Sequence, residues 1–378
     1  MIKRVLQNII RDEIKDFHKA IVVLGARQVG KTTLLKQLVK DKKDVLYFNA
    51  DEPNVRDLFT NVGKQQLMQV LGNAKYVVID EAQRIENVGI TLKIITDQLP
   101  DKQLFVSGSS SLDLANKINE PLTGRKFEHI LFPLSFGEMV EHTNLWEEKN
   151  KLKTRLIYGY YPEIVTNPGK EIALLLNLTG SYLYQDILSF GWIKKPVILD
   201  KLLKALALQI GQEVKYNELA KTVGADKETI ERYIDLLEKV FIIFKLPALN
   251  RNVRNEIKKG KKIYFYDTGI RNAVIGDFKN FDLRTDKGAL WENFIVSERI
   301  KFLNYNGFYG RYYFWRTTQQ QEIDFIEEQD GQFSIYEFKL NTNKKHIFSK
   351  TFLNKYPVTQ HQLITPKNIE KFLLPKIL

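Results

Sequence analysis

Residues Gly25 to Thr32 read GARQVGKT, and this stretch decides the fold of the N-terminal part of the chain. The order G-x-x-x-x-G-K-T is that of a phosphate-binding loop. It stands between an apolar, β-branched run at 21–24 and a segment with helical apolar spacing at 33–40, which is the context this motif requires. Its glycines let the backbone curl so that N–H groups point at phosphates, and the start of the helix adds partial positive charge. A plain glycine turn before a helix is the weaker explanation.

The residue types of this loop predict a nucleotide and a metal ion. We expect Lys31 to reach the β- and γ-phosphates and the hydroxyl of Thr32 to bind Mg²⁺. The expected cofactors are therefore ATP and Mg²⁺. The predicted nucleotide-binding residues are Gly25, Arg27, Gln28, Val29, Gly30, Lys31, Thr32 and Thr33.

Two carboxylates follow a buried strand further along the chain. The apolar run at 76–79 ends in Asp80 and Glu81, and downstream of a phosphate-binding loop this is the Walker B pattern. Asp80 is predicted to hold Mg²⁺, and Glu81 to act as the general base that polarises the attacking water. Ser107 and Ser109 leave the next strand, and Ser109 is the catalytic candidate that would sense the γ-phosphate or the water. A serine-rich turn that caps the following helix is the alternative for either serine.

Arg125 completes the predicted catalytic set. It lies in a predicted loop before an apolar strand at 127–132. A loop arginine can neutralise γ-phosphate charge, either in cis or from a neighbouring subunit. A solvated surface arginine is the equal alternative.

The motifs together resemble those of the prokaryotic AAA+-type P-loop ATPases of the archaeal-ATPase-like family. The resemblance is carried by the runs 25–33, 79–84 and 107–109, with further matching blocks at 122–125 and 133–138. The family also has a Gly-Gly-aromatic-Pro block in a helical lid. Here that block is Tyr158 to Glu163, with Tyr160 in place of the second glycine, and no nucleotide contact is assigned to it.

The segment from 196 to 275 has the element order of a winged helix. Apolar spacing predicts helices at 197–209, 217–224 and 226–240, and strands at 241–246 and 263–266. The stretch Arg251–Lys262 holds six basic residues against one acid, and as a wing it would track DNA phosphates. The predicted recognition helix carries acids at 228, 231, 235 and 238, so it is a poor reader of bases. A packing role is the alternative for this segment.

The last hundred residues carry a second acidic site. Predicted strands lie at 312–316, 321–326 and 335–340, after a helix that begins at 288. Alternation places Glu337 and Lys339 on one face, Asp324 converges with them if the strands pair, and Glu292 joins from the helix. This set resembles the PD-(D/E)XK nuclease-like superfamily, which implies that Asp324 and Glu337 hold Mg²⁺ while Lys339 orients or activates a water. An exposed ion-pair network on a sheet is the alternative, and nuclease activity stays open.

Composition bounds the class of protein. The 378 residues are 44% apolar and 27% charged, an ordinary globular balance that excludes a fully disordered chain. No apolar run approaches the ~20 residues of a membrane span, and no export signal is seen, so we expect a cytoplasmic protein without membrane contact. Cysteine is absent, which excludes disulfides and a thiol nucleophile. The net charge of +12 favours a polyanionic partner, and a merely basic protein explains it equally well.

We therefore predict an α/β chain with four parts. They are a P-loop AAA+-like ATPase core at 1–140, a helical lid or connection at 141–195, a winged helix at 196–275 and a nuclease-like α/β domain at 285–378. One predicted function is a Mg²⁺-dependent ATPase that couples nucleotide state to DNA binding or processing. The other is an ATP-dependent signalling or scaffold switch whose C-terminal domain is an inactive protein-binding module. Either is compatible with a homo-oligomer.

Overall fold

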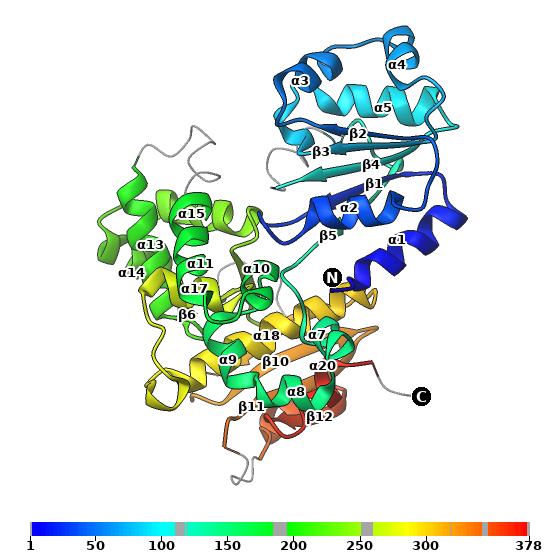
Figure 1. Cartoon of the computed structure of the whole chain (residues 1–378). Helices are drawn as coiled ribbons and strands as arrows, with labels where there is room; N and C mark the ends of the chain where they lie inside the picture. The colour runs from blue at the N-terminus through cyan, green and yellow to red at the C-terminus, as the bar shows by residue number, and fades with distance from the viewer. Residues whose placement is uncertain are drawn as a thin grey trace. The chain divides into compact units, whose positions relative to one another are not determined.

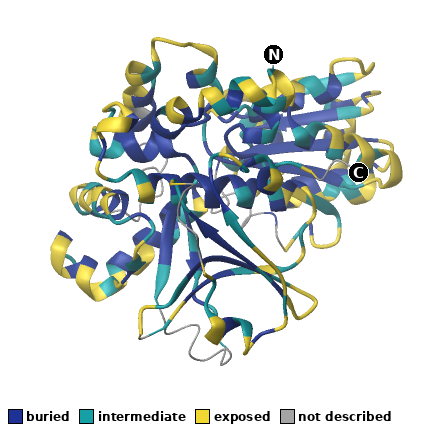
Figure 2. Ribbon diagram, turned by 90° about the horizontal axis from the view of Figure 1, so that it is seen from below, coloured by how far each residue is buried: buried dark blue, intermediate teal, exposed yellow. Residues whose placement is uncertain are grey.

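The structure is a computed structural model that describes residues 2–109, 118, 120–183, 195–250, 260–317, 319–341 and 347–375. The chain divides into compact units. Unit 1 is Met1–Leu134 with Lys239–Phe241, and unit 2 is Ser135–Glu238 with Ile242–Leu378. In the described residues, unit 1 contains one sheet and unit 2 contains two, and each unit has its own buried core (Figures 1 and 2).

Unit 1 is a parallel sheet with helices on both faces. In its described part the sheet has five strands in the order β2-β3-β4-β1-β5, all parallel. The strands are β1 (Ala20–Leu24), β2 (Val45–Asn49), β3 (Tyr76–Asp80), β4 (Gln103–Gly108) and β5 (Lys126–Ile130). The helices are α1 (Val5–Asp16), α2 (Lys31–Val39), α3 (Pro53–Phe59), α4 (Lys64–Leu71) and α5 (Val88–Gln98), with a 3₁₀ turn η1 at Ala82–Arg84.

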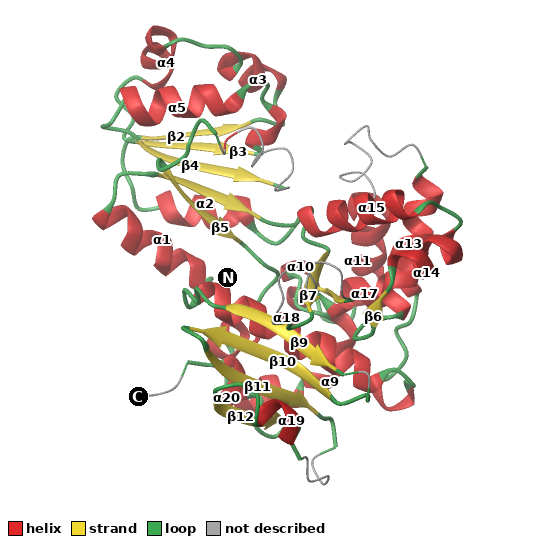
Figure 3. Ribbon diagram, turned by 180° about the vertical axis from the view of Figure 1, so that it is seen from behind, coloured by secondary structure: helices red, strands yellow, loops and turns green. Residues whose placement is uncertain are grey.

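The burial of the strands follows from this layering. Figures 1 and 3 show α1 and α2 on one face of the sheet and α3 to α5 on the other. Every residue of β1 and of β4 is buried, as expected for central parallel strands covered on both faces. At the exit of β1 a Cβ on Gly25 would lie 2.3 Å from the carbonyl oxygen of Leu131, so only glycine fits there. This fold confirms the predicted P-loop α/β arrangement.

Unit 2 begins with short helices and continues into a mixed segment. The first helices are α7 (Phe136–His142), α8 (Leu145–Asn150), α9 (Leu152–Tyr158), α10 (Pro162–Thr166), α11 (Glu171–Asn177) and a π-helix η3 (Leu178–Leu183). The mixed segment contains α13 (Pro196–Leu208), β6 (Glu213–Val214), α14 (Tyr216–Val223), α15 (Lys227–Lys239), β7 (Ile243–Pro247) and β8 (Lys261–Phe265). Its described strands form a three-stranded antiparallel sheet in the order β6-β8-β7. The helices and strands predicted here are present, within a few residues.

The C-terminal part of unit 2 is a separate sheet, as predicted. Its elements are α17 (Thr268–Ile275), η4 (Phe281–Leu283), α18 (Lys287–Tyr305), β9 (Arg311–Arg316), β10 (Glu322–Gln329), β11 (Gln332–Phe338), α19 (Lys350–Leu353), β12 (Val358–Ile364) and α20 (Glu370–Leu373). Within the described ranges the sheet has four strands in the order β12-β11-β10-β9, antiparallel except for the parallel pair β11 and β12. In Figure 3, α18 runs along this sheet. Aromatic and aliphatic side chains of β9 to β11 pack with Phe352 of α19 into a buried cluster.

A β-bulge interrupts the alternation of β10. Ile323 pairs with Trp315 and Ile326 pairs with Tyr313, so β10 uses one residue more than β9 over this interval. Ile323 and Ile326 consequently pack into the same cluster. Asp324 lies in the bulge, where the simple alternation of the sequence prediction does not hold.

A buried polar network joins the first helices of unit 2 to α17. Arg155 donates to both carboxylate oxygens of Glu148, at 3.1 and 2.7 Å, and Tyr160 donates to Glu148 at 3.2 Å. The backbone N–H of Tyr160 donates to Asp267 at 2.7 Å, and Asp267 also caps α17 through the N–H of Ile270. Burial and the carboxylate of Glu148 raise the pKa of Tyr160, so its hydroxyl remains a donor. The residue that replaces the expected second glycine is therefore a structural part of this network.

No helix among the described residues combines the length and the apolar character needed to cross a lipid bilayer.

The network makes Gly159 a sensitive position. Its φ is +72°, and a Cβ there would lie 2.0 Å from a carboxylate oxygen of Asp267. We expect Gly159→Ala to destabilise unit 2 by about 2–4 kcal/mol, the sum of a left-handed backbone and an overpacked contact. Urea unfolding followed by tryptophan fluorescence measures this, because Trp146, Trp192, Trp291 and Trp315 are the four tryptophans of the chain and all belong to unit 2.

Gly276→Ala is the matched control. Gly276 has a φ of +65°, and a Cβ added there would meet no atom within 4 Å, so only the backbone cost of ~1–2 kcal/mol applies. Equal losses of stability in the two variants would contradict a steric clash between the Cβ at position 159 and the carboxylate of Asp267.

Candidate functional site

The ammonium of Lys31 lies inside the loop that precedes it. Lys31 is the first residue of α2, and its Nζ donates to the carbonyl oxygens of Gly25 and Ala26 at 3.1 and 3.0 Å. The same Nζ lies 4.0 Å from Oε1 of Glu81. Its side chain is 4% exposed, so the positive charge is concentrated at the centre of the loop rather than in solvent.

The carboxylate of Asp80 collects hydroxyl groups from three elements. Thr32 of α2 donates to Oδ2 at 2.7 Å, Tyr47 of β2 donates to the same oxygen, and Ser107 of β4 donates to Oδ1. Asp80 is the last residue of β3 and is buried. The predicted metal-binding pair, Thr32 and Asp80, is therefore in direct contact.

Glu81 follows in a conformation that turns its side chain toward the loop. Its φ is +54°, an unusual value for a residue with a side chain, and such strain is typical of functional sites. Its backbone N–H donates to Ser107 at 3.1 Å. Gln83 of η1 donates to Oε2 of Glu81 at 2.5 Å and to the hydroxyl of Ser109 at 3.0 Å. Gln83 thus links Ser109 to Glu81 by hydrogen bonds, and Ser107 contacts Asp80 directly.

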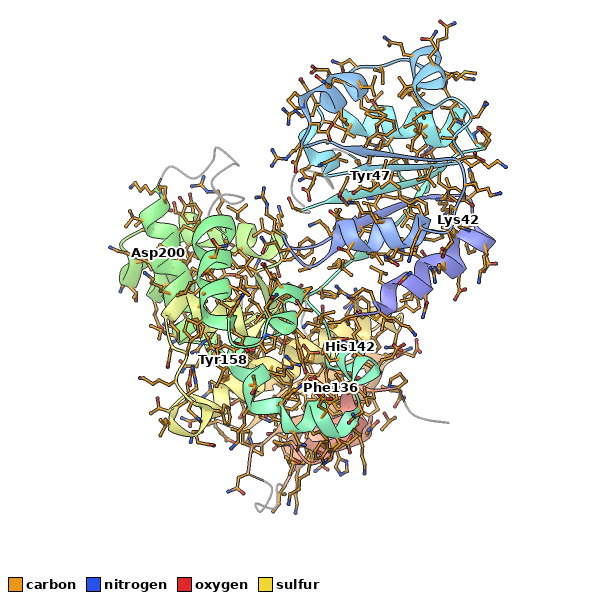
Figure 4. The ribbon with its side chains drawn as sticks, viewed as in Figure 1. Lys42, Tyr47, Phe136, His142, Tyr158 and Asp200 are labelled. Carbon is orange, nitrogen blue, oxygen red and sulfur yellow. The ribbon has the colours of Figure 1, made fainter. Side chains whose placement is uncertain are left out.

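Tyr47 and Arg4 belong to this site, and the sequence analysis missed both. Tyr47, labelled in Figure 4, stands on β2, the strand beside β3. Burial and the hydrogen bond to Asp80 raise the pKa of Tyr47, which keeps its hydroxyl a donor. Arg4 precedes α1 and donates to the carbonyl oxygen of Val29 in the loop at 2.7 Å and to that of Phe132 at 2.5 Å. A hydroxyl near the carboxyl end of the strand beside Walker B is a usable sequence signal, whereas nothing near Arg4 points to the loop.

The other predicted loop residues have different degrees of exposure. Gln28 and Thr33 are exposed, Arg27 is partly buried, and the side chain of Val29 is buried. Gln28 and Gly30 have φ values of +60° and +99°, which is the tight backbone curl that the motif predicts.

The structure does not bring Arg125 to this site. Arg125 precedes β5, and its neighbour Lys126 pairs with Ala20 at the start of β1, whereas the loop follows the other end of β1. Its guanidinium pairs with Asp97 at 2.5 Å. The prediction that Arg125 acts in cis is therefore wrong, because the length of the strand separates the two. A contribution from a neighbouring subunit stays a prediction.

The N-terminal site fits a nucleotide with a divalent ion. It offers a hydroxyl and a carboxylate in contact, a buried ammonium and a curled loop of backbone N–H groups. Hydroxyl and carboxylate oxygens are the protein ligands that Mg²⁺ accepts, and the loop with its lysine suits phosphates.

The predicted C-terminal residues also come together. Lys339 Nζ lies 3.3 Å from Glu337 Oε2 and 3.9 Å from Asp324 Oδ2, and the N–H of Phe338 donates to Asp324 at 2.8 Å. Burial and the nearby charge of Glu337 raise the pKa of Asp324 to about 7. Glu292 reaches the same cluster from α18, where burial raises its pKa and Lys262 partly offsets that effect. Their predicted role as metal ligands stays a prediction.

Part of the predicted basic wing is not available to DNA. Residues 251–259 lie outside the described residues. Lys262, the last residue of the predicted wing, is 2% exposed and pairs with Glu292 at 2.9 Å. A buried lysine held by carboxylates does not contact phosphates, so its assignment to the wing surface is wrong. Lys261 remains partly exposed at the start of β8.

Three family models match successive parts of the chain. Residues 17–140 match an AAA domain, residues 149–280 match a domain of unknown function (DUF8612), and residues 287–372 match another (DUF4143). The first of these covers the sheet and the candidate nucleotide site of unit 1.

Similar proteins come from several different organisms. An uncharacterized protein of Mycobacterium tuberculosis is 27% identical over 330 residues, which cover 85% of this chain and 71% of the relative. An uncharacterized protein of Haemophilus influenzae is 27% identical over 350 residues, covering 85% of this chain and 82% of the relative. Among solved structures, a Walker-type ATPase of Pyrococcus abyssi is 15% identical with a TM-score of 0.49, over 72% of this chain and 96% of that one. The AAA-domain match, together with the parallel sheet and its loop, supports a P-loop ATPase family for the N-terminal part of the chain.

Proposed function

We propose that this chain is a Mg²⁺-dependent ATPase whose nucleotide state is coupled to DNA binding. The observation that carries the ATPase part is the continuous set of contacts that joins Lys31 and Glu81 on one side to Thr32 and Asp80 on the other. Each of these residue types has a distinct task in phosphoryl transfer, and the AAA-domain match covers all of them.

The tasks follow from the contacts. Lys31 carries a desolvated positive charge and stabilises negative charge on the phosphates. Glu81 accepts a proton from the attacking water, and Gln83 fixes the orientation of its carboxylate. Thr32 and Asp80 would hold Mg²⁺, which when bound supplies positive charge that offsets the charge of the phosphates. Ser109 holds Gln83 in place and so positions Glu81.

Charge supports the DNA part of the proposal. A net charge of +12 gives the chain a sequence-independent attraction for polyphosphates. The acids of α15 weaken this attraction less than the sequence suggests, because the carboxylates of Asp235 and Glu238 are both paired with Lys245. The order α13-β6-α14-α15-β7-β8 with its antiparallel sheet supports a winged helix, in which the stretch before β8 would be the wing.

A second candidate is an ATP-dependent signalling or scaffold switch that binds protein partners. It is favoured by Glu228 and Glu231, which are exposed on α15 and would repel phosphates. The two candidates differ in whether DNA changes the rate of hydrolysis.

Glu81→Gln should separate nucleotide binding from hydrolysis. Because the amide cannot accept the proton, we expect hydrolysis to fall by about 10²–10⁴-fold while ATP binding stays near the wild-type value.

Lys31→Ala should instead weaken ATP binding by ~10–100-fold through the loss of charged hydrogen bonds. Phosphate release and equilibrium binding of a fluorescent ATP analogue measure the two effects. Lys42→Ala (Figure 4) is the control, since Lys42 lies beyond the far end of α2 and contacts the ring of Tyr76. Full hydrolysis by Glu81→Gln would contradict the assigned base.

Tyr47→Phe should change the Mg²⁺ requirement. Without the hydroxyl, Asp80 loses a partner that orients its carboxylate, and such changes weaken metal binding by about 10–100-fold. Titration of ATP hydrolysis with Mg²⁺ should show a higher half-saturating concentration with little change in the maximal rate. Tyr76→Phe serves as the control from the opposite end of the sheet. An unchanged Mg²⁺ requirement would assign Tyr47 to packing alone.

DNA should bind in a salt-dependent manner and stimulate hydrolysis. We expect affinity for duplex or single-stranded DNA to fall at least ~10-fold between ~50 and ~200 mM salt, because phosphate contacts release counterions. Fluorescence anisotropy of labelled DNA, with Glu81→Gln held in ATP and wild type held in ADP, compares the nucleotide states. DNA that neither binds nor alters hydrolysis would exclude this coupling and leave the switch as the better candidate.

A further inference from the structure

Lys262 pairs with two members of the C-terminal carboxylate cluster, which consists of Glu292, Glu322, Asp324 and Glu337. It stands on β8, outside the C-terminal sheet, and its ammonium lies 2.9 Å from Glu292 Oε1 and 2.7 Å from Glu322 Oε1. The same Nζ lies 5.4 Å from the centre of the Phe314 ring, a further favourable environment for a cation. A lysine with 2% exposure is tolerated only where carboxylates compensate its charge.

The carboxylates that a metal ion would need are already engaged. Glu292 Oε1 also accepts a hydrogen bond from the hydroxyl of Tyr264 at 2.7 Å. Asp324 Oδ2 accepts from the backbone N–H of Phe338 and lies near the ammonium of Lys339. Glu337 is in contact with Lys339 as well. Each carboxylate of the cluster therefore has a cation or a hydrogen-bond donor on it.

This arrangement does not fit a divalent ion. Mg²⁺ requires oxygen ligands at about 2.0–2.1 Å in nearly octahedral geometry. Over the described residues, no group of three or more Asp, Glu, His or Cys side chains is arranged to hold a metal ion. A divalent ion placed among these carboxylates would also meet the buried ammonium of Lys262, and repulsion between like charges at such short range is strong.

We propose that Lys262 takes the place of the divalent cation in this cluster, so that the wild-type cluster binds no Mg²⁺ or Mn²⁺. The C-terminal part of unit 2 then keeps its carboxylate residues as an internal ion-pair core. It then does not support metal-dependent cleavage. The inference concerns a site apart from the nucleotide site, and it stands whether or not the proposed ATPase is active.

The same geometry predicts what removal of the lysine would do. Without the ammonium, Glu292, Glu322 and the buried Asp324 form a set of neighbouring acids, and among the described residues only Lys339, whose Nζ lies 3.9 Å from Asp324 Oδ2, is left to compensate their charge. Such a set is unstable unless a cation enters. We therefore expect Lys262→Met to let these carboxylates close onto a Mn²⁺ ion, which would create a site that the wild-type chain lacks.

The test is Mn²⁺ binding by electron paramagnetic resonance, with the full chain and without nucleotide. All variants carry Asp80→Asn, which removes the carboxylate that would hold a metal ion at the nucleotide site. We expect Asp80→Asn and Asp80→Asn/Asp324→Asn to bind Mn²⁺ equally. Addition of Lys262→Met to the Asp80→Asn chain should create a site at least ~10-fold tighter than any background binding. That site should disappear when Asp324→Asn is added to it.

Two controls keep the test decisive. Lys261→Met changes the neighbouring lysine of the same strand, whose Nζ lies 6.0 Å from the ring of Tyr216, and should create no site. Thermal unfolding followed by tryptophan fluorescence should show Mn²⁺ stabilising the Lys262→Met chain and not the chain with Lys262 intact.

Two results would overturn the proposal. One is a Mn²⁺ ion bound by the Asp80→Asn chain and lost with Asp324→Asn, which would show a metal bound beside Lys262. The other is a folded Lys262→Met variant that gains no Mn²⁺ site. If Lys262→Met does not fold, the comparison of Asp80→Asn with Asp80→Asn/Asp324→Asn decides, because it leaves Lys262 in place.

Discussion

A single buried carboxylate holds the candidate nucleotide site of unit 1 together. Asp80 accepts hydroxyl groups from Thr32, Tyr47 and Ser107, which come from α2, β2 and β4. Because a buried charge without partners is costly, these elements are tied to one arrangement at the carboxyl ends of the strands. The loop before α2 is fixed at its other side by Arg4 through the carbonyl of Val29. The orientation of Glu81 depends on the same edge, since its backbone N–H donates to Ser107.

The part of this site that is contiguous in sequence could be predicted, and the rest could not. The spacing of Gly25 to Thr32 and the pair Asp80-Glu81 place a strand, a loop and two carboxylates without any knowledge of neighbours. Tyr47 and Arg4 contribute through contacts over long sequence distances, and of the two only the hydroxyl of Tyr47, on the strand beside Asp80, has a sequence signal. Arg125 shows the opposite error, because a basic residue in a loop has no sequence feature that tells one end of a strand from the other.

In unit 2 the elements were predictable and their charges were not. Alternating apolar residues predicted β9 to β11, and helical spacing predicted α13 to α15 and α18. The convergence of Asp324, Glu337 and Lys339 was also expected. Lys262, counted among the lysines of a basic stretch, is instead buried against Glu292 and Glu322. A charge count along the sequence cannot separate a surface lysine from one that compensates buried acids.

The bulge in β10 limits how this sheet can change in length. Between Ile323 and Ile326 the strand has one residue more than its partner β9. Deletion of one residue there would remove the bulge and restore regular pairing with β9, so that Ile323 and Ile326 would stay on one face of the sheet. Only one of the two bulge residues, Asp324 and Phe325, would then remain between them, so the place of Asp324 in the ion-pair core depends on the extra residue. The composition of the ion-pair core thus depends on backbone length as well as on residue identity, and this segment should accept substitutions far more readily than insertions or deletions over evolutionary time.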